Sequence, residues 1–350
     1  MFWGVRPRFL MPSAYQRVDP SVSYEFIQDA DDVTDSAGPP SVLEAGAGVD
    51  RRQEGEHNIP MVRRYTLDDL ATQPGLALHV EHSVFPERSF EPHTHDFTEL
   101  VVVQHGRAMH VVDDRAYPVS AGDVFVVQPN DVHAYRDMVG LDICSIGFDP
   151  ELLFDADSDL FGIPGFHMLF HLEPAFRRDH ALPSRLRLTK EQIHYVIGFV
   201  EAIEEELSER APGYVAMLRA HFALLVGFLA RNYTSRGDNA SERLVRMSRV
   251  VAYIEDHYSE PLTLDALAEM ACMSRNTLIR AFRRCYGTTP MDYLIRRRLR
   301  RSTELLLRRE ATVTEVAYAV GFSDSSYYAR QFRRRYGRSP SGYRREQLNG

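Results

Sequence analysis

The chain has 350 residues, of which 44% are hydrophobic and 26% are charged, and this composition is typical of a globular protein with room for two domains. Its net charge of −8 would exclude a uniformly basic nucleic-acid-binding protein, but the charge is distributed unevenly. Residues 241–350 contain 21 Arg and no Lys against 12 acidic residues, a balance of +9, whereas residues 1–240 have a balance of −17. A basic module of the kind that contacts phosphates is therefore attached to an acidic one.

The sequence lacks the features of a membrane protein, of a secreted protein and of a protein built on a disulfide or zinc framework. No apolar run approaches the length of a membrane span, and residues 1–10 are too short and too interrupted for a signal peptide, so we expect a cytoplasmic protein with no membrane partner. The three cysteines, Cys144, Cys272 and Cys285, are widely spaced and form no CxxC pair. This spacing excludes a disulfide or zinc framework.

The chain begins with a segment that predicts no packed core. Residues 1–58 contain an acidic cluster at 29–35, Gly-Pro-Pro at 38–40 and no sustained periodicity, so we expect a disordered extension. Short strand-like stretches follow from residue 59 to residue 180. They are an alternating stretch at 76–85, apolar runs at 100–103 and 124–127, a hairpin of 109–112 with 116–119, and a closing strand at 141–148. This pattern is typical of a small β-barrel or jelly roll.

Three histidines and one glutamate fall among these strands and form the first candidate site. They are His93, His95, Glu99 and His133. The odd-numbered positions 93, 95 and 99 share one face if they lie on one extended strand. Three imidazoles and a carboxylate that converge inside a barrel can hold a first-row transition metal.

The same residues resemble the two cupin motifs. His93-Thr94-His95, Glu99 and Gly106 match the first motif, and Gly122, Pro129 and His133 match the second. The resemblance implies that all four metal-ligand positions are present. Four readings stay open: a metal-free effector pocket in which the histidines bind a polyol, a sensor that holds a divalent transition metal, a working metalloenzyme, and core histidines without a ligand. We expect no other cofactor.

Two helical stripes follow the predicted barrel, in residues 181–235. Thr189 and Gln192 form a capping box, and apolar residues recur at helical spacing over 193–207 and, after Pro212, over 215–229. The stripes either pack on the barrel or form a dimer seam, and we expect a homodimer because a small barrel can cover only part of them. Residues 236–242 are polar and predict a linker.

Residues 243–350 contain the same helix-turn-helix pattern twice. Phe282-Arg283-Arg284, Tyr286-Gly287 and Pro290 recur fifty positions later as Phe332-Arg333-Arg334, Tyr336-Gly337 and Pro340. In each copy a short helix with small residues precedes a turn and a longer Arg-rich helix, as a helix-turn-helix requires. Two such units on one chain can reach successive major grooves of double-stranded DNA.

The longer helix of each copy predicts a buried face and a reading face. Leu278 and Phe282 are expected to face the core, whereas Asn276 and Arg280, also four apart, share another face. The second copy repeats the arrangement with Tyr328 and Phe332 inward and Ser326 and Arg330 outward. An Arg beside an amide or hydroxyl is suited to base edges, because Arg can bind guanine and Asn can bind adenine bidentately.

The block from 263 to 343 resembles the AraC/XylS-type transcription regulators, most clearly in the run 317–332 and in Tyr336-Gly337-Arg338-Ser339-Pro340. The resemblance implies two helix-turn-helix subdomains joined by a linker helix over about 290–307. It also implies activation through RNA polymerase. The base-contacting positions that it implies, with Arg275 beside them, are Arg275, Asn276, Ile279, Arg280, Ser325, Ser326 and Arg330. Ile279 departs from the polar preference at its position and can make only apolar contact.

The stretch 92–100 and the segment 164–174 are most similar to the sugar-responsive, rhamnose-type members of that family, which implies a carbohydrate effector. We therefore predict an α+β chain with an N-terminal cupin-like barrel, a helical dimerisation segment and a C-terminal all-α double helix-turn-helix domain. The predicted function is that of a transcription regulator, an activator, and not an enzyme. A cupin metalloenzyme would instead turn over a substrate, and a DNA-packaging protein would bind without sequence preference.

Overall fold

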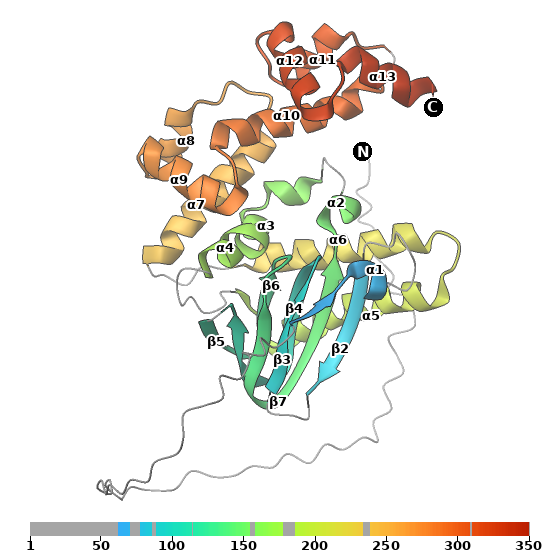
Figure 1. Ribbon diagram of the computed structural model, residues 1–350, viewed down its shortest axis with the longest axis vertical. Coiled ribbons are helices and arrows are strands. Elements are labelled where there is room, and N and C mark those ends of the chain that lie inside the picture. The colour runs from blue at the N-terminus through green and yellow to red at the C-terminus, as the bar shows by residue number, and fades with distance from the viewer. Residues whose placement is uncertain are drawn as a thin grey trace, which may run out of the picture. The chain divides into compact units, whose positions relative to one another are not determined.

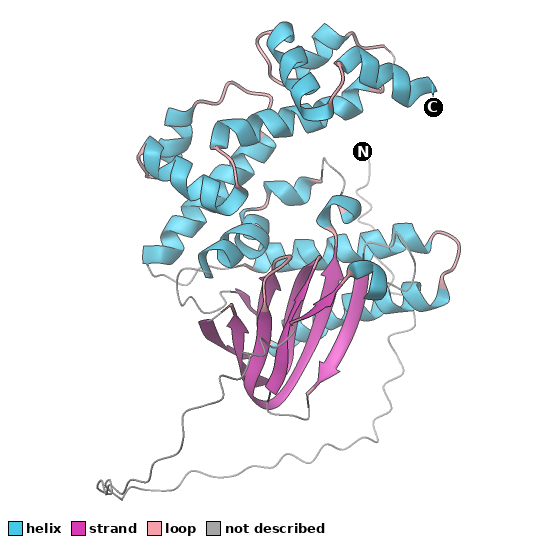
Figure 2. Cartoon of the chain, in the orientation of Figure 1, coloured by secondary structure: helices cyan, strands magenta, loops and turns pink. Residues whose placement is uncertain are grey.

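A computed structural model describes residues 62–70, 78–85, 89–113, 115–154, 158–177, 186–233, 239–308 and 310–349. The predicted disordered extension, residues 1–58, and the first part of the predicted linker, residues 236–238, lie outside the described residues. Strands dominate the first half of the described chain, and the second half is helical (Figures 1 and 2). The predicted α+β class is confirmed.

Eight described strands form one sheet in the N-terminal domain. They are β1 (Arg63–Tyr65), β2 (Leu78–Val84), β3 (Ser89–His95), β4 (Thr98–Val112), β5 (Arg115–Ser120), β6 (Asp123–Val127), β7 (His133–Phe148) and β8 (Leu186–Arg187). The sheet has the order β1-β3-β7-β4-β6-β8, with β2 paired to β7 and β5 paired to β4. The long strands β4 and β7 each pair with different strands along their length. The sheet can therefore curve around the side chains on its inner face.

The predicted hairpin is present as β4 and β5, which pair from Arg107 with Ser120 to Val112 with Arg115. Two glycines of the predicted cupin motifs lie at bends in this part of the sheet. Gly106 has φ +73°, and a Cβ there would lie 2.1 Å from the carbonyl oxygen of Gly140. Gly122 has φ +94°, and a Cβ there would lie 2.5 Å from the carbonyl oxygen of Leu188. Only glycine fits both the dihedral angle and the space at these positions.

Short helical segments connect the sheet to two long helices. They are α1 (Leu67–Leu70), α2 (Pro150–Leu153), η2 (Asp159–Gly162), α3 (Pro164–His167), the π-helical turn η3 (Met168–Leu172) and α4 (Glu173–Arg177). The long helices are α5 (Lys190–Glu209) and α6 (Tyr214–Asn232). The predicted capping box begins α5, because the Thr189 side chain accepts from the Gln192 amide and the Gln192 side chain accepts from the Thr189 amide.

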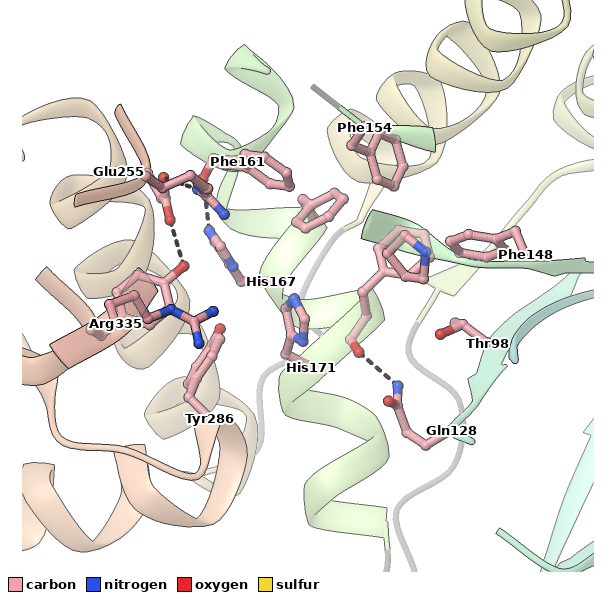
Figure 3. A pocket seen from close by; sticks show the side chains of 15 residues that line it. Thr98, Gln128, Phe148, Phe154, Phe161, His167, His171, Glu255, Tyr286 and Arg335 are labelled. Carbon is pink, nitrogen blue, oxygen red and sulfur yellow. Dashed lines mark hydrogen bonds and ion pairs between the residues drawn. The ribbon is translucent and has the colours of Figure 1, made fainter. Parts of the chain in front are cut away.

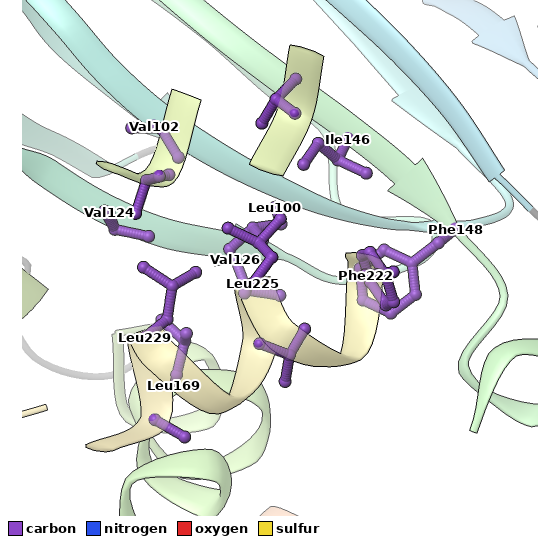
Figure 4. Packing of buried hydrophobic residues seen from close by; sticks show 14 of the residues in the cluster. Leu100, Val102, Val124, Val126, Ile146, Phe148, Leu169, Phe222, Leu225 and Leu229 are labelled. Carbon is purple, nitrogen blue, oxygen red and sulfur yellow. The ribbon is translucent and has the colours of Figure 1, made fainter. Parts of the chain in front are cut away.

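Helix α6 covers the sheet with its apolar stripe. Phe222, Leu225 and Leu229 are fully buried and lie in one cluster with side chains from β4, β6 and β7, among them Leu100, Val126, Ile146 and Phe148 (Figure 4). Helix α5 buries Val196, Val200 and Ile203 in the same cluster. Both apolar stripes therefore pack within this domain. Large apolar side chains that stay exposed on α5 and α6 include Tyr195, Met217 and Leu224.

The expectation that no apolar run approaches a membrane span is wrong for α6. Over Tyr214–Asn232 this helix is long and apolar enough to cross a membrane by length and composition. Leu218, Phe222 and Leu229 are nevertheless completely buried against the sheet and α5. A core helix of a globular domain has the same composition, because apolar residues are needed where it is covered.

The C-terminal domain contains the helices α7 (Asn239–Asp256), α8 (Leu264–Met270), α9 (Arg275–Tyr286), α10 (Pro290–Leu306), α11 (Val313–Ala319), α12 (Ser325–Tyr336) and α13 (Pro340–Asn349). Helix α7 begins inside the range predicted as a linker. The two helix-turn-helix units have separate apolar cores, one around Leu278 and Phe282 and one around Tyr328 and Phe332. Helix α10 joins them where the linker helix was predicted.

Candidate DNA interface and sensor site

Helix α9 presents the predicted reading face to solvent. Leu278 and Phe282 are fully buried, whereas Asn276 and Arg280 are exposed and Ile279 is half-buried. The Ser274 side chain caps the helix by accepting from the Thr277 amide. The periodicity therefore placed both faces of this helix correctly, and the exposed face is free to meet base edges.

Helix α12 repeats this arrangement. Tyr328 and Phe332 are fully buried, Ser326 and Arg330 are exposed, and Ser325 is half-buried. The Asp324 carboxylate caps the helix by accepting from the amides of residues 326 and 327. The Arg330 guanidinium carbon lies 5.7 Å from the centre of the Tyr327 ring, a cation–π contact that restricts the Arg side chain on the exposed face.

Arg275 lies apart from the other predicted base contacts. Its guanidinium forms a two-pronged ion pair with the carboxylate of Asp265 on α8. Both side chains are mostly exposed, at 63% for Arg275 and 62% for Asp265. The pair joins the two helices of the first unit and holds the Arg275 guanidinium in place through Nε and Nη2.

The sheet brings three of the four predicted sensor residues together. The Glu99 Oε2 atom lies 3.7 Å from His95 Nε2 and 3.8 Å from His133 Nε2. One ligand atom from each of these residues lies within 4.8 Å of the other two. All three atoms are buried and have no hydrogen-bond partner among the described residues. Two imidazoles and one carboxylate are a donor set that first-row transition metals accept.

Hydrogen bonds on the far side of each ring fix which nitrogen faces the cluster. His95 Nδ1 donates to the carbonyl oxygen of Phe97 at 2.7 Å, so its Nε2 atom faces the cluster. His133 Nδ1 lies 3.4 Å from His110 Nε2, so the Nε2 atom of His133 also faces the cluster. An outer partner of this kind orients imidazoles that bind metals or polar ligands.

The charge of the cluster follows from its burial. Desolvation keeps the pKa of His133 well below its usual value, so this ring is neutral. Desolvation by itself raises the pKa of Glu99, but the neighbouring imidazoles of His95 and His133 lower it to about 2. Glu99 is therefore the negatively charged member of the site.

The prediction that positions 93, 95 and 99 share one face of one strand is wrong. His93 and His95 lie on β3, a turn follows, and Glu99 lies on β4. His93 pairs in register with His133, and their ring centres are 4.0 Å apart. His93 is absent from the group of converging ligand atoms and packs against it instead.

A cavity of about 540 Å³ outside this cluster was not predicted. It is lined by residues from both domains, including His167, His171 and Tyr286 (Figure 3). Tyr286 is more than 100 positions from His167 and His171 in the chain and meets them only in the fold. The only local signal was the spacing of two histidines by four residues within an aromatic stretch, which places both on one side of a helix.

Comparison with known proteins agrees with both halves of this description. A model of a helix-turn-helix domain matches residues 267–346, and a model of the AraC-like ligand binding domain matches residues 76–212. The HTH-type transcriptional activator RhaS of Escherichia coli O139:H28 is 30% identical over 259 residues, which are 74% of this chain and 89% of that protein. The chain belongs to the AraC family of transcription regulators. RhaS of Escherichia fergusonii is 29% identical over 255 residues, which are 73% of this chain and 87% of that protein.

This AraC-family regulator is also similar to solved DNA-binding domains. One is the domain of AdpA, a global transcriptional factor, in complex with a target DNA, at 36% identity over 29% of this chain and 91% of that one, with a TM-score of 0.28. The family, the two matched domains and the relatives together make the chain a DNA-binding transcription regulator with a ligand-binding domain, and not an enzyme.

Proposed function

We propose that this AraC-family regulator activates transcription when a small polar effector binds at His95, Glu99 and His133. The observation that carries the proposal is the convergence of three buried, unpartnered polar atoms from these residues. Buried polar atoms without partners cost free energy, which a ligand with matching groups recovers. His93 forms one wall of the site through its ring contact with His133.

A carbohydrate is the effector class that we propose. A sugar hydroxyl can donate to the carboxylate or to an imidazole lone pair, and it can do so without bringing a charge into the buried site. The similarity to activators named RhaS supports the activating role, and the proposal includes contact with RNA polymerase as the means of activation. An effector of this kind acts by its different affinity for two arrangements of the DNA-binding domains.

A divalent transition metal is the second candidate occupant. Two buried imidazole nitrogens and one buried carboxylate oxygen match the two-histidine, one-carboxylate set that leaves other coordination positions open. His95, Glu99 and His133 would hold the ion. It would then supply a Lewis-acidic contact for a ligand oxygen, and the protein would be a metal-bearing sensor.

We further propose that two copies associate through the outer faces of α5 and α6. Tyr195 is 53% exposed, Met217 is 47% exposed and Leu224 is 56% exposed, although all three are large apolar side chains. Apolar residues that remain exposed beside a covered stripe favour a further helix as partner. A cytoplasmic homodimer would then present its DNA-binding domains to two half-sites.

Thermal unfolding of the full chain tests the occupant of the cluster. The protein is heated with a panel of sugars that includes L-rhamnose, each with and without a chelator, because a ligand that binds only the folded state raises the midpoint. A shift with one sugar that survives chelation supports the effector proposal. Loss of stability on chelation, with no sugar shift, supports the metal instead.

Two histidine variants make this test specific. His133→Ala removes one of the converging atoms and should abolish the ligand-dependent shift. His105→Ala is the matched control, because His105 lies on the same sheet with a 77% exposed side chain paired to Asp142. If His133→Ala keeps the full shift, the effector binds elsewhere and the proposal is wrong.

A further inference from the structure

The cavity of about 540 Å³ has one strongly apolar end. Its volume is within the range of pockets that hold small organic ligands. The apolar end is formed by aromatic rings from β7 and from the segment that links the sheet to α5 (Figure 3). These rings are Phe148, Phe154, Phe166 and Phe170, and Phe161 lies between them and the opposite end, with its ring centre 5.2 Å from the Arg300 guanidinium carbon. Such a wall favours a flat, apolar ring.

The opposite end is polar and is contributed by the DNA-binding domain. Tyr286 of α9, Arg300 of α10 and Arg335 of α12 line it together with Glu255 of α7. A smaller cavity of about 220 Å³ shares these residues and adds Arg296 and Arg297. Four guanidinium groups and one carboxylate therefore surround this end of the space.

The single carboxylate is already neutralised. Glu255 lies 2.5 Å from the Arg297 guanidinium and accepts a hydrogen bond from the Tyr293 hydroxyl at 2.5 Å. Arg300 reaches it more weakly, at 3.4 Å. In the part of the chain that the structure describes, no ion pair involves Arg335. The remaining positive charge favours an anionic group at this end of the cavity.

Three buried polar atoms of the lining have no hydrogen-bond partner among the described residues. One is the Tyr286 hydroxyl, and another is Nε of Arg300. The third is Nδ1 of His167, a residue that is only 1% exposed. His167 Nε2 donates to the carbonyl oxygen of Phe161 at 2.7 Å, and burial lowers the pKa of His167 to about 3. His167 is therefore neutral, and its Nδ1 is an acceptor that lacks a donor.

We propose that this cavity is a second ligand site, separate from the histidine cluster of the barrel, and that it binds a small aromatic carboxylic acid with a ring hydroxyl. The phenylalanine rings bury the aromatic ring. Arg300 and Arg335 pair with the carboxylate. The ring hydroxyl of the ligand donates a hydrogen bond to His167 Nδ1. The Tyr286 hydroxyl bonds to the ligand as well, so both of these buried polar atoms gain a partner.

Such a ligand would couple the two domains. Its site exists only while α3 and η3 of the sensor domain face α7, α9, α10 and α12 of the DNA-binding domain. A ligand that binds one arrangement and not another shifts the population towards the first, in proportion to its concentration over its Kd. The acid would therefore hold the DNA-binding domain against the sensor domain.

Isothermal titration calorimetry on the full chain tests the chemistry with three probes. They are 4-hydroxybenzoate, benzoate, which lacks the hydroxyl, and 4-hydroxybenzyl alcohol, which lacks the charge. We expect 4-hydroxybenzoate to bind about tenfold or more tightly than either of the others, since each lacks one of the predicted polar contacts. Absence of binding by all three, or equal binding by the acid and the alcohol, overturns the proposal.

Two variants locate the site. Arg335→Gln and Tyr286→Phe should each weaken 4-hydroxybenzoate about tenfold, the effect of losing one hydrogen bond to a charged group. Tyr286→Phe removes an unpartnered hydroxyl and should fold as the parent does. Arg334→Gln is the matched control, because Arg334 is exposed on the same helix and does not line the cavity. Unchanged affinity in both cavity variants, or an equal loss in the control, means that the acid binds elsewhere.

Discussion

Replacing Phe222 by Ala should unfold the sensor domain at much lower denaturant. Phe222 is completely buried, and its ring centre lies 4.8 Å from that of Phe148 and 5.5 Å from that of Phe154. Truncation of a buried Phe costs about 3–5 kcal/mol of the free energy of unfolding. We expect the upper part of that range, because two ring pairs worth about 0.5–1.5 kcal/mol each are lost together.

Urea unfolding followed by circular dichroism measures this loss, with Leu224→Ala as the control on the same helix. Leu224 is 56% exposed, so at low protein concentration its truncation should change stability by less than about 0.5 kcal/mol. At higher concentration Leu224→Ala should weaken self-association if α6 forms the dimer surface. A loss below about 1 kcal/mol for Phe222→Ala would refute the packing of α6 on the sheet.

Three further predictions concern DNA, pH and the second helix-turn-helix. Arg280→Ala and Arg330→Ala should each cost about 1–3 kcal/mol at one base position, measured by fluorescence anisotropy on single-base operator variants; a uniform loss would indicate phosphate contacts. Since the pKa of His167 falls to about 3 on folding, this residue should contribute about 1.4 kcal/mol per pH unit to the loss of free energy of unfolding from about pH 6 towards pH 4. His167→Gln should lower the slope by that amount, and the part that remains comes from other buried histidines such as His171, whose pKa is lowered to about 4. Gly321→Ala should destabilise by about 1–3 kcal/mol, because φ is +93° and a Cβ would lie 2.6 Å from a backbone oxygen. Gly213→Ala, also at φ +93° but in open space, should cost less in the same unfolding assay.

The DNA-binding half was predictable because its pattern occurs twice. Each copy of the pattern shows the same apolar helix positions. Leu278 and Phe282 of the first copy correspond to Tyr328 and Phe332 of the second, and all four are buried. The turn residues indicated where the helices end, since Gly287 and Gly337 terminate α9 and α12 in the left-handed conformation. Helical periodicity is local, so a window of a dozen residues contains most of this information.

The sensor half was predictable only in part, because its site depends on contacts between distant segments. The strands were found, but the turn between His95 and Glu99 was read as continuous strand, and the separate place of His93 was missed. No local pattern in the sequence predicts the strand register that places His93 opposite His133. The cavity between the domains was missed for the same reason, since His167 and Tyr286 are neighbours only in the folded chain.

Helix α10 determines which operators the two reading helices can occupy together. It runs without interruption from Pro290 to Leu306, about 25 Å at 1.5 Å per residue, and its residues enter the cores of both units. A rigid connection of fixed length also fixes the angle between the two recognition helices about the DNA axis. Insertion of one base pair between their two boxes rotates one box by about 34° relative to the other. Tolerance of operator spacing should therefore be narrow within one protomer, and in the proposed homodimer variation in spacing should occur between the half-sites of the two protomers.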